Sequence, residues 1–249
     1  MIRVSIDVFY HNARLRIVAL LAEIPPETYN VPVAACPGWR VRDVVGHLTG
    51  IVEDSLAGRM TQVPPDEMQT ADEVARYCDL PFEEVLERWE QGANAFEEVI
   101  GTLDIWQAAV DILSHEHDIR AAVGRPGARD AEGVEVMARR LLRFKPPVPF
   151  TVQVENAEFH CGDPAEHSTG DGDGNGDGDG SGSGTGDNPA DSGTHPEKLV
   201  LNSTYWDVLR WRMGRRSRTQ LAAMDWSRDP GPALDHLVVF GPALADIIE

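Results

Sequence analysis

The chain has 249 residues, of which 42% are hydrophobic and 25% charged, and its formal net charge is −19. This length suits one large domain or two modest ones, and the acidic balance argues against nucleic-acid binding because phosphates would repel it. There is no apolar run of 18 residues or more, so we expect no membrane-spanning helix. We expect no signal peptide, and three scattered cysteines without a CxxC pair fit a reducing cytoplasm.

The first part of the chain has the periodicity of helices. Apolar residues recur at helical spacing over residues 4–23, 41–58, 71–77, 82–100, 105–123 and 131–144. The stretch at 71–77 predicts only a short helical turn, and Asp130 is the candidate N-cap of the last helix. Four long helices with short connections predict a helix bundle.

The pattern changes after Pro146 and Pro147. Alternation over residues 150–154 predicts a half-buried strand, and residues 198–201 predict another. Ser203 is expected to cap a helix that runs through Met213, residues 218–226 to form a strand, and residues 233–240 a closing helix. We therefore expect a helical domain over residues 1–147 and an α+β domain over residues 148–249.

A glycine- and aspartate-rich segment interrupts this second domain. Residues 162–196 contain 11 of the 23 glycines, eight acidic residues and no Lys or Arg. Such a segment buries too little apolar surface to offset its ordering entropy, so we expect a flexible insertion. Asp171, Asp173, Asn175 and Gly176 match the first half of an EF-hand loop, but Gly182 stands where the bidentate Glu is needed. The pattern favours a linker over a calcium site.

Three residues on two predicted helices form a candidate metal site. Asp111 and His115 are four residues apart, so both project from one helix face and can hold one ion. His47 lies on a second helix, and three protein ligands would leave one position open, as in catalytic zinc sites; ferrous iron would fit too. The alternatives are a core histidine at 47 and a solvated acidic face on the later helix.

The neighbours of His115 have other expected roles. His117 is only two residues away and faces another direction, whereas Asp118 is placed to orient a ligand. Glu116 and Arg120, four apart, are expected to form a surface ion pair.

Two segments together resemble a known family. The stretch CPGWRVRDVVGHL, followed by DILSHEHDIRAAVGRPGARD, resembles the mycothiol-dependent maleylpyruvate isomerase family of actinobacteria. STYWDVLRWRMGRRSRTQLAAMDWSRDP and the closing FGPALADIIE are similar to that family's smaller domain. The resemblance implies a DinB-like four-helix bundle followed by a sterol-carrier-like α+β domain.

The resemblance also implies a ligand set. The family's metal is held by a histidine after a PGW turn and by a Glu-x-x-x-His pair, which fall on His47, Asp111 and His115. This sequence has Asp111 where the pattern often has Glu; aspartate is one methylene shorter but still offers a carboxylate ligand, so we expect metal binding with an altered ligand geometry. It also has Arg40 where a Thr or Ser commonly caps the helix.

The activity implied by the resemblance uses mycothiol and a divalent metal such as zinc. The metal lowers the thiol pKa, and the resulting thiolate adds to the cis double bond of maleylpyruvate; rotation and elimination then give fumarylpyruvate. A dicarboxylate substrate needs a cationic anchor, for which Arg215 is the first candidate and Arg216 the second. Thiol transfer to another electrophile is the related reaction. Cys36 lies in a turn and is a poor nucleophile candidate.

Two non-enzymatic functions compete with this one. The first is a metal- or lipid-binding module built on a sterol-carrier-like domain. The second is a zinc-binding anti-sigma regulator, which the missing CxxC pair disfavours. The sequence leaves the substrate, the metal and the oligomeric state open.

Overall fold

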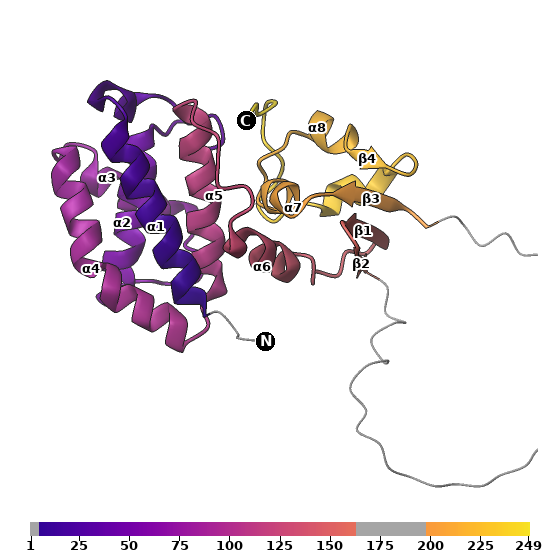
Figure 1. The fold of residues 1–249 in the computed structure, drawn as a ribbon, viewed down its shortest axis with the longest axis horizontal. Coiled ribbons are helices and arrows are strands. Elements are labelled where there is room, and N and C mark those ends of the chain that lie inside the picture. The colour runs from indigo at the N-terminus through magenta and orange to yellow at the C-terminus, as the bar shows by residue number, and fades with distance from the viewer. Residues whose placement is uncertain (1–4, 163–197) are drawn as a thin grey trace, which may run out of the picture.

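The computed structural model describes residues 5–162 and 198–249 (Figure 1). The predicted insertion at 162–196 lies outside these ranges except for its first residue, Gly162, and its half EF-hand lies outside them entirely. The described chain is mostly helical, with a small sheet in its C-terminal part. Its helices are α1 (Ile6–Glu23), α2 (Val41–Leu56), α3 (Glu67–Tyr77), α4 (Phe82–Thr102), α5 (Trp106–Ala122), α6 (Glu132–Leu141), α7 (Tyr205–Arg212) and α8 (Arg218–Ala222), with 3-10 turns at Pro26–Asn30 and Gly231–His236. None of them is both long and apolar enough to cross a lipid bilayer.

The predicted helices of the first part are present, with two corrections. The helical turn expected at 71–77 is a full helix, α3, that begins at Glu67 because the Asp66 side chain accepts a hydrogen bond from the Gln69 amide at 2.8 Å. Asp130 does not cap α6; the residue at that position is Ala131, whose side chain makes no capping bond.

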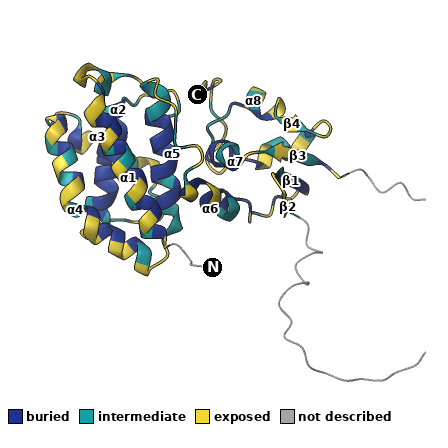
Figure 2. Ribbon diagram, in the orientation of Figure 1, coloured by how far each residue is buried: buried dark blue, intermediate teal, exposed yellow. Residues whose placement is uncertain are grey.

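Helices α1, α2, α4 and α5 pack their apolar faces together (Figure 2). Trp89 on α4 is buried in this core and donates its indole N–H to the Tyr10 hydroxyl of α1 at 3.2 Å, so the polar atom of the large ring is satisfied. Each such fully buried large side chain contributes about 1.5–3 kcal/mol through removal of apolar surface from water.

Helix α3 crosses α2 at unusually short range. A Cβ atom on Gly50 would lie 2.7 Å from the Cβ of Glu73, and one on Gly46 would lie 3.3 Å from the Cβ of Tyr77. The two glycines are four residues apart, so they form one small-residue face on α2. This face lets α3 bring the Glu73 side chain against α2.

The sheet has the strand order β2-β1-β3-β4, from Ala157–Cys161, Phe150–Val154, Val200–Ser203 and Asp225–Trp226. β1 pairs antiparallel with β2 and parallel with β3, and β3 pairs antiparallel with β4. The prediction of β1 is confirmed, whereas β2 was not predicted.

Three other predictions for this part were wrong. Residues 218–226 contain helix α8 and only two strand residues, because the Ser217 side chain accepts from the Gln220 amide and caps a helix there. The cap of α7 is Thr204 and not Ser203, and the closing helix at 233–240 is a 3-10 turn that ends at His236.

The C-terminal part is attached to the bundle through α7, which lies beside α5 and α6 (Figure 1). Arg210 of α7 is fully buried and donates to the Asp118 carboxylate at 2.6 Å and to the Ser114 carbonyl at 3.0 Å, both on α5. Its other partner is Glu249. A buried ion pair therefore joins the two parts of the chain next to the residues predicted to bind metal.

Candidate metal centre

The structure brings His47, Asp111 and His115 together. The His47 Nε2 atom lies 3.7 Å from one Asp111 carboxylate oxygen, and the His115 Nε2 atom lies 3.5 Å from the other. The three ligand atoms all fall within 4.8 Å of one another. Helix α5 provides two of the three because residues 111 and 115 are one turn apart, and α2 provides the third.

Buried carboxylates fix the orientation of both imidazole rings. The His47 Nδ1 atom is 2.7 Å from Glu73 of α3, and the His115 Nδ1 atom is 3.1 Å from Asp118. A carboxylate on Nδ1 holds the proton there and leaves the Nε2 lone pair free, which is the arrangement found behind metal-binding histidines. Both free nitrogens face Asp111.

A tight turn before α2 covers the two rings. Over residues 36–39 the Trp39 amide donates to the Cys36 carbonyl at 2.9 Å, and Gly38 has a φ of 86°, which identifies a type II turn with Pro37 in its second position. The turn places the Trp39 ring 5.2 Å from the His47 ring and 6.3 Å from the His115 ring, between centroids. Trp39 therefore forms an apolar wall of the site.

The start of α2 tolerates Arg40 at the capping position. The Asp43 carboxylate accepts from the backbone N–H of Arg40 at 2.8 Å and also binds its guanidinium. The departure from a Thr or Ser cap is thus compensated within the first turn of the helix.

The charges at the site favour a bound cation. Burial alone would lower the pKa of His47, but its hydrogen bonds with Asp111 and Glu73 raise it to about 9. For Asp111 the two effects have the opposite signs: burial alone would raise its pKa, but the nearby His115 and His47 lower it. In the metal-free protein His47 therefore carries a proton at neutral pH, and a metal ion competes with that proton for Nε2.

A second group of ligand atoms, from Cys36, His115 and Asp118, also lies within 4.8 Å. Burial raises the pKa of the Cys36 thiol, so a metal ion would have to displace the thiol proton before the sulfur could bind. Asp118 already accepts from Arg210 and Arg215 at 2.6 and 2.9 Å. The first group is therefore the better match to a divalent ion.

That first group has the donor chemistry of a divalent metal site. Two imidazole nitrogens and a carboxylate suit zinc or ferrous iron. The side chains of His47 and His115 are 5% and 6% exposed, whereas that of Asp111 is 31% exposed. The site is therefore closed behind the imidazoles and open to solvent beside Asp111.

The predicted anchor Arg215 lies on the other side of His115. Its guanidinium donates to Asp118 at 2.9 Å and to the Met213 carbonyl at 2.6 Å, and Arg216 pairs with Glu249 at 2.6 Å. Burial would raise the pKa of Asp118, but the charges of Arg215 and Arg210 hold it well below its usual range. Arg215 is thus placed to orient the carboxylate that orients His115.

Two further expectations for α5 can be compared with the structure. His117 does face away from the site: its ring lies 5.9 Å from the Trp206 ring, and burial together with Arg210 lowers its pKa to about 3. The predicted ion pair between Glu116 and Arg120 is present at 3.0 Å, but it does not lie on the surface: Glu116 is fully buried and is also bound by Arg16 of α1 at 2.6 Å.

The sequence did not point to Glu73 or Trp39 as parts of this site. Glu73 is 26 residues from His47, on a helix predicted only as a turn. The signal that was present is Gly46 and Gly50 on either side of His47, since paired small residues mark a close helix contact. Trp39 belongs to the PGW turn that carried the resemblance.

Replacing Glu73 with glutamine is expected to weaken zinc binding by roughly 10–100-fold, because the neutral amide holds the Nδ1 proton of His47 less firmly. Competition with a chromophoric chelator measures the affinity. Glu97→Gln is the matched control: Glu97 contacts the Nδ1 atom of His11 at 2.9 Å, away from the site. An equal loss of affinity in both variants would contradict a positioning role for Glu73.

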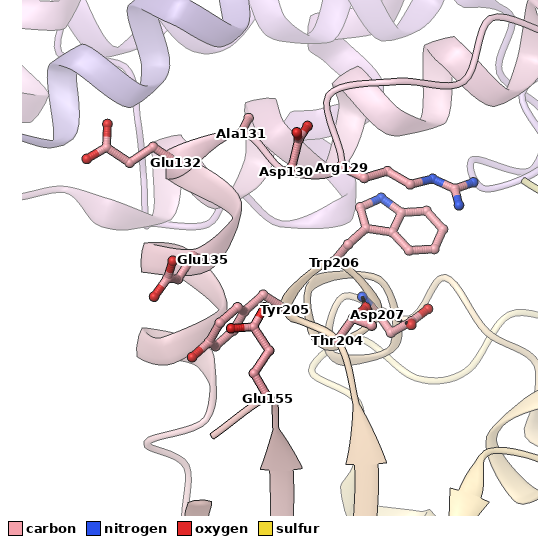
Figure 3. A pocket seen from close by; sticks show the side chains of 10 residues that line it. All are labelled: Arg129, Asp130, Ala131, Glu132, Glu135, Glu155, Thr204, Tyr205, Trp206 and Asp207. Atoms are coloured by element: carbon pink, nitrogen blue, oxygen red, sulfur yellow. Dashed lines mark hydrogen bonds between the residues drawn. The ribbon is translucent and has the colours of Figure 1, made fainter. Parts of the chain in front are cut away.

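A separate hollow of about 570 Å³ lies between the start of α6 and the start of α7 (Figure 3). In it the Arg129 guanidinium stacks on the Trp206 ring, 3.9 Å from the centroid. The other charged side chains that line it are the carboxylates of Asp130, Glu132, Glu135, Glu155 and Asp207. Since Trp206 contacts His117, this acidic hollow lies on the face of α5 opposite the imidazole site.

Comparison with known proteins identifies the N-terminal part. Residues 10–143 match the family model of the mycothiol maleylpyruvate isomerase N-terminal domain. No curated protein and no solved structure matches the chain. The matched region holds α2, α3 and α5 and therefore every residue of the imidazole site. The chain belongs to the mycothiol maleylpyruvate isomerase family.

Proposed function

We propose that this protein is a metal-dependent enzyme that uses a low-molecular-weight thiol, mycothiol, on a small electrophile, by cis–trans isomerisation or by thiol transfer. The observation that carries the proposal is the pair of buried imidazoles. Each is fixed by a carboxylate on Nδ1, and both direct Nε2 toward Asp111 at the open side of the site. The choice of mycothiol as the thiol rests on membership of the family.

In this proposal His47, Asp111 and His115 hold one divalent ion, for which zinc is the first choice. When bound, such an ion lowers the pKa of a coordinated thiol and so supplies a nucleophilic sulfur at neutral pH. Glu73 and Asp118 contact the Nδ1 atoms of the two imidazoles, which directs Nε2 toward the ion and fixes the orientation of both rings. Trp39 excludes water from the covered side, which strengthens the electrostatic interactions within the site.

The DinB-like and sterol-carrier-like assignments and the domain division after residue 147 are part of the same proposal.

We also propose that the Arg215 side chain contacts the substrate. Its bonds to Asp118 and Met213 use only part of the five N–H donors of the guanidinium. An Arg215→Lys variant tests the contact: a substrate anchor predicts a raised KM, whereas a role only through Asp118 predicts a change in metal affinity.

The thiol chemistry is tested without any electrophile. Protein loaded with cobalt(II) in place of zinc is titrated with mycothiol, and the proposal expects a thiolate-to-cobalt charge-transfer absorption that saturates at one thiol per chain. The His47→Ala variant should show none of it. A cobalt-loaded protein that never develops this absorption would contradict the enzyme proposal and favour a non-catalytic metal-binding module.

A further inference from the structure

Three arginines are buried among the residues that the structure describes, and one of the three lacks a carboxylate partner there. Arg14 pairs with Glu97 at 3.0 Å, and Arg210 pairs with Asp118 at 2.6 Å. The third is Arg212 at the end of α7, which is 7% exposed and forms no ion pair within the described ranges. A buried charge without a partner is unfavourable, so its presence at this position needs a physical reason.

The contacts of Arg212 satisfy only part of its guanidinium. The Nη1 atom donates to the Leu237 carbonyl, and the guanidinium lies over the Phe144 ring, 3.8 Å from the ring centroid. The Nε atom is buried and has no hydrogen-bond partner among the described residues. Burial lowers the pKa of Arg212 to about 10, so the side chain still carries its charge at neutral pH. One positive charge and one N–H donor are therefore left without a partner.

Arg212 lines a cavity of about 380 Å³ between the start of α5, the end of α6 and the end of α7. This volume falls in the range of small-molecule sites, roughly 300–1,000 Å³. The walls are apolar or basic and are formed by Trp106, Arg140, Leu141, Arg143, Phe144, Arg212 and Val239. These lining residues, all from the described part of the chain, include no carboxylate, although the net charge of the whole protein is −19. The cavity is therefore locally positive in an acidic protein.

The two other arginines of the cavity lie three residues apart at the end of α6. Arg140 binds Asp104 through two nitrogens at 3.1 Å, whereas Arg143 is exposed and pairs with no described carboxylate. Cations at the C-terminus of a helix also interact favourably with the helix dipole, so these two residues alone would not indicate a ligand. The buried, unpartnered Nε atom of Arg212 is the feature that does.

This cavity is separate from the candidate metal centre. None of the three candidate metal ligands is among its lining residues. Arg210 and Arg212 are two residues apart on α7, so their side chains leave the helix in nearly opposite directions. Arg210 reaches Asp118 of α5, whereas Arg212 reaches Phe144 after α6. A ligand bound at Arg212 would therefore occupy a second site.

We propose that this cavity binds a small aromatic carboxylate. One negative charge balances the one unpaired buried cation, and the two carboxylate oxygens can accept from Nε and a second N–H of the Arg212 guanidinium. The ring of the ligand then lies against the apolar side chains of Trp106 and Val239. Phosphate would bring more charge than Arg212 balances and would leave these walls uncovered. The proposal does not depend on the thiol chemistry proposed above.

The probe for this site is para-fluorobenzoate, whose binding to the full-length protein is followed by fluorine NMR. Zinc-loaded and metal-free protein are compared because a carboxylate can also bind zinc directly. We expect one probe per chain with the same affinity in both forms, and at least about tenfold weaker binding of the neutral para-fluorobenzamide. Inorganic phosphate at the concentration of the probe should not displace it.

Two variants locate the bound probe. Arg212→Met removes the charge but keeps an unbranched side chain, so it should raise the Kd by at least about tenfold, with urea unfolding to confirm that it folds. Val239→Asp places a carboxylate on a wall residue that is 46% exposed and should also weaken binding, because this carboxylate competes for Arg212. Val8→Asp is the matched control: it adds the same charge at a valine of α1 that is 39% exposed and should leave the Kd unchanged.

Probe binding that Arg212→Met and Val239→Asp both leave intact would overturn the proposal. Binding to the zinc-loaded form alone would overturn it too, because the probe would then be at the metal centre. Equal affinity for the neutral amide, displacement by phosphate, or no binding of the probe would each contradict the ligand class. These outcomes are independent of the cobalt titration, so the second site and the thiol chemistry can fail separately.

Discussion

Replacing His115 with alanine is expected to lower zinc affinity by more than about 100-fold, beyond the effect of changing an outer hydrogen-bond partner. The variant loses one of three ligands, and the remaining two, His47 and Asp111, come from different helices. Zinc content after dialysis against a weak chelator, measured by mass spectrometry, gives the result directly. His47→Ala should behave in the same way.

The matched control is His117→Ala, two residues further along the same buried helix. The His117 ring packs against Trp206 and points away from the site. It should therefore retain zinc even if its stability falls. Equal zinc loss from the variants at 115 and 117 would indicate a general disturbance of α5 and would contradict the assigned ligand.

Replacing Asp118 with alanine is expected to lower the free energy of unfolding by about 3 kcal/mol or more. Arg210 and Asp118 are both fully buried, and the substitution leaves the guanidinium with Glu249 as its remaining carboxylate partner. Removing one member of a buried ion pair costs much more than the pair contributes, because the other charge stays out of water. Urea unfolding of metal-free protein isolates this effect from metal binding.

An exposed ion pair made by Asp207 of α7 gives the comparison. Asp207 pairs with Arg216 at 3.4 Å and its side chain is 39% exposed, so Asp207→Ala should change stability by less than about 1 kcal/mol. If Asp118→Ala unfolds at the same urea concentration as Asp207→Ala, the ion pair between α5 and α7 does not stabilise the fold in the way described.

The candidate ligands Asp111 and His115 could be predicted from sequence because their relative position depends only on the geometry of one helix. Asp111 and His115 are one helical turn apart, and this spacing holds wherever the helix packs. The carboxylate behind His47 could not be found this way, since its position depends on how closely α3 approaches Gly46 and Gly50. Helix packing also explains the error at Glu116. The sequence predicts that its ion pair is exposed, but Arg16 of α1 packs against Glu116, which is buried.

The C-terminal part was harder to predict because its elements are short. The stretch from 218 to 226 contains apolar residues that suit a strand, but Ser217 and Gln220 form a capping box that starts a helix of five residues. Strand β2 has exposed and half-buried positions without a clean alternation. Residues 157–161 form a strand mainly because they pair with β1 after a tight turn, and less because of their own composition.

The central claim is that one ion is held by His47, Asp111 and His115 and not by the neighbouring group that includes Cys36. X-ray absorption at the zinc edge, on zinc-loaded protein without added thiol, distinguishes the two sets. Our account predicts only nitrogen and oxygen neighbours, at about 2.0–2.2 Å. A sulfur neighbour at about 2.3 Å would place the ion beside Cys36 and contradict the account.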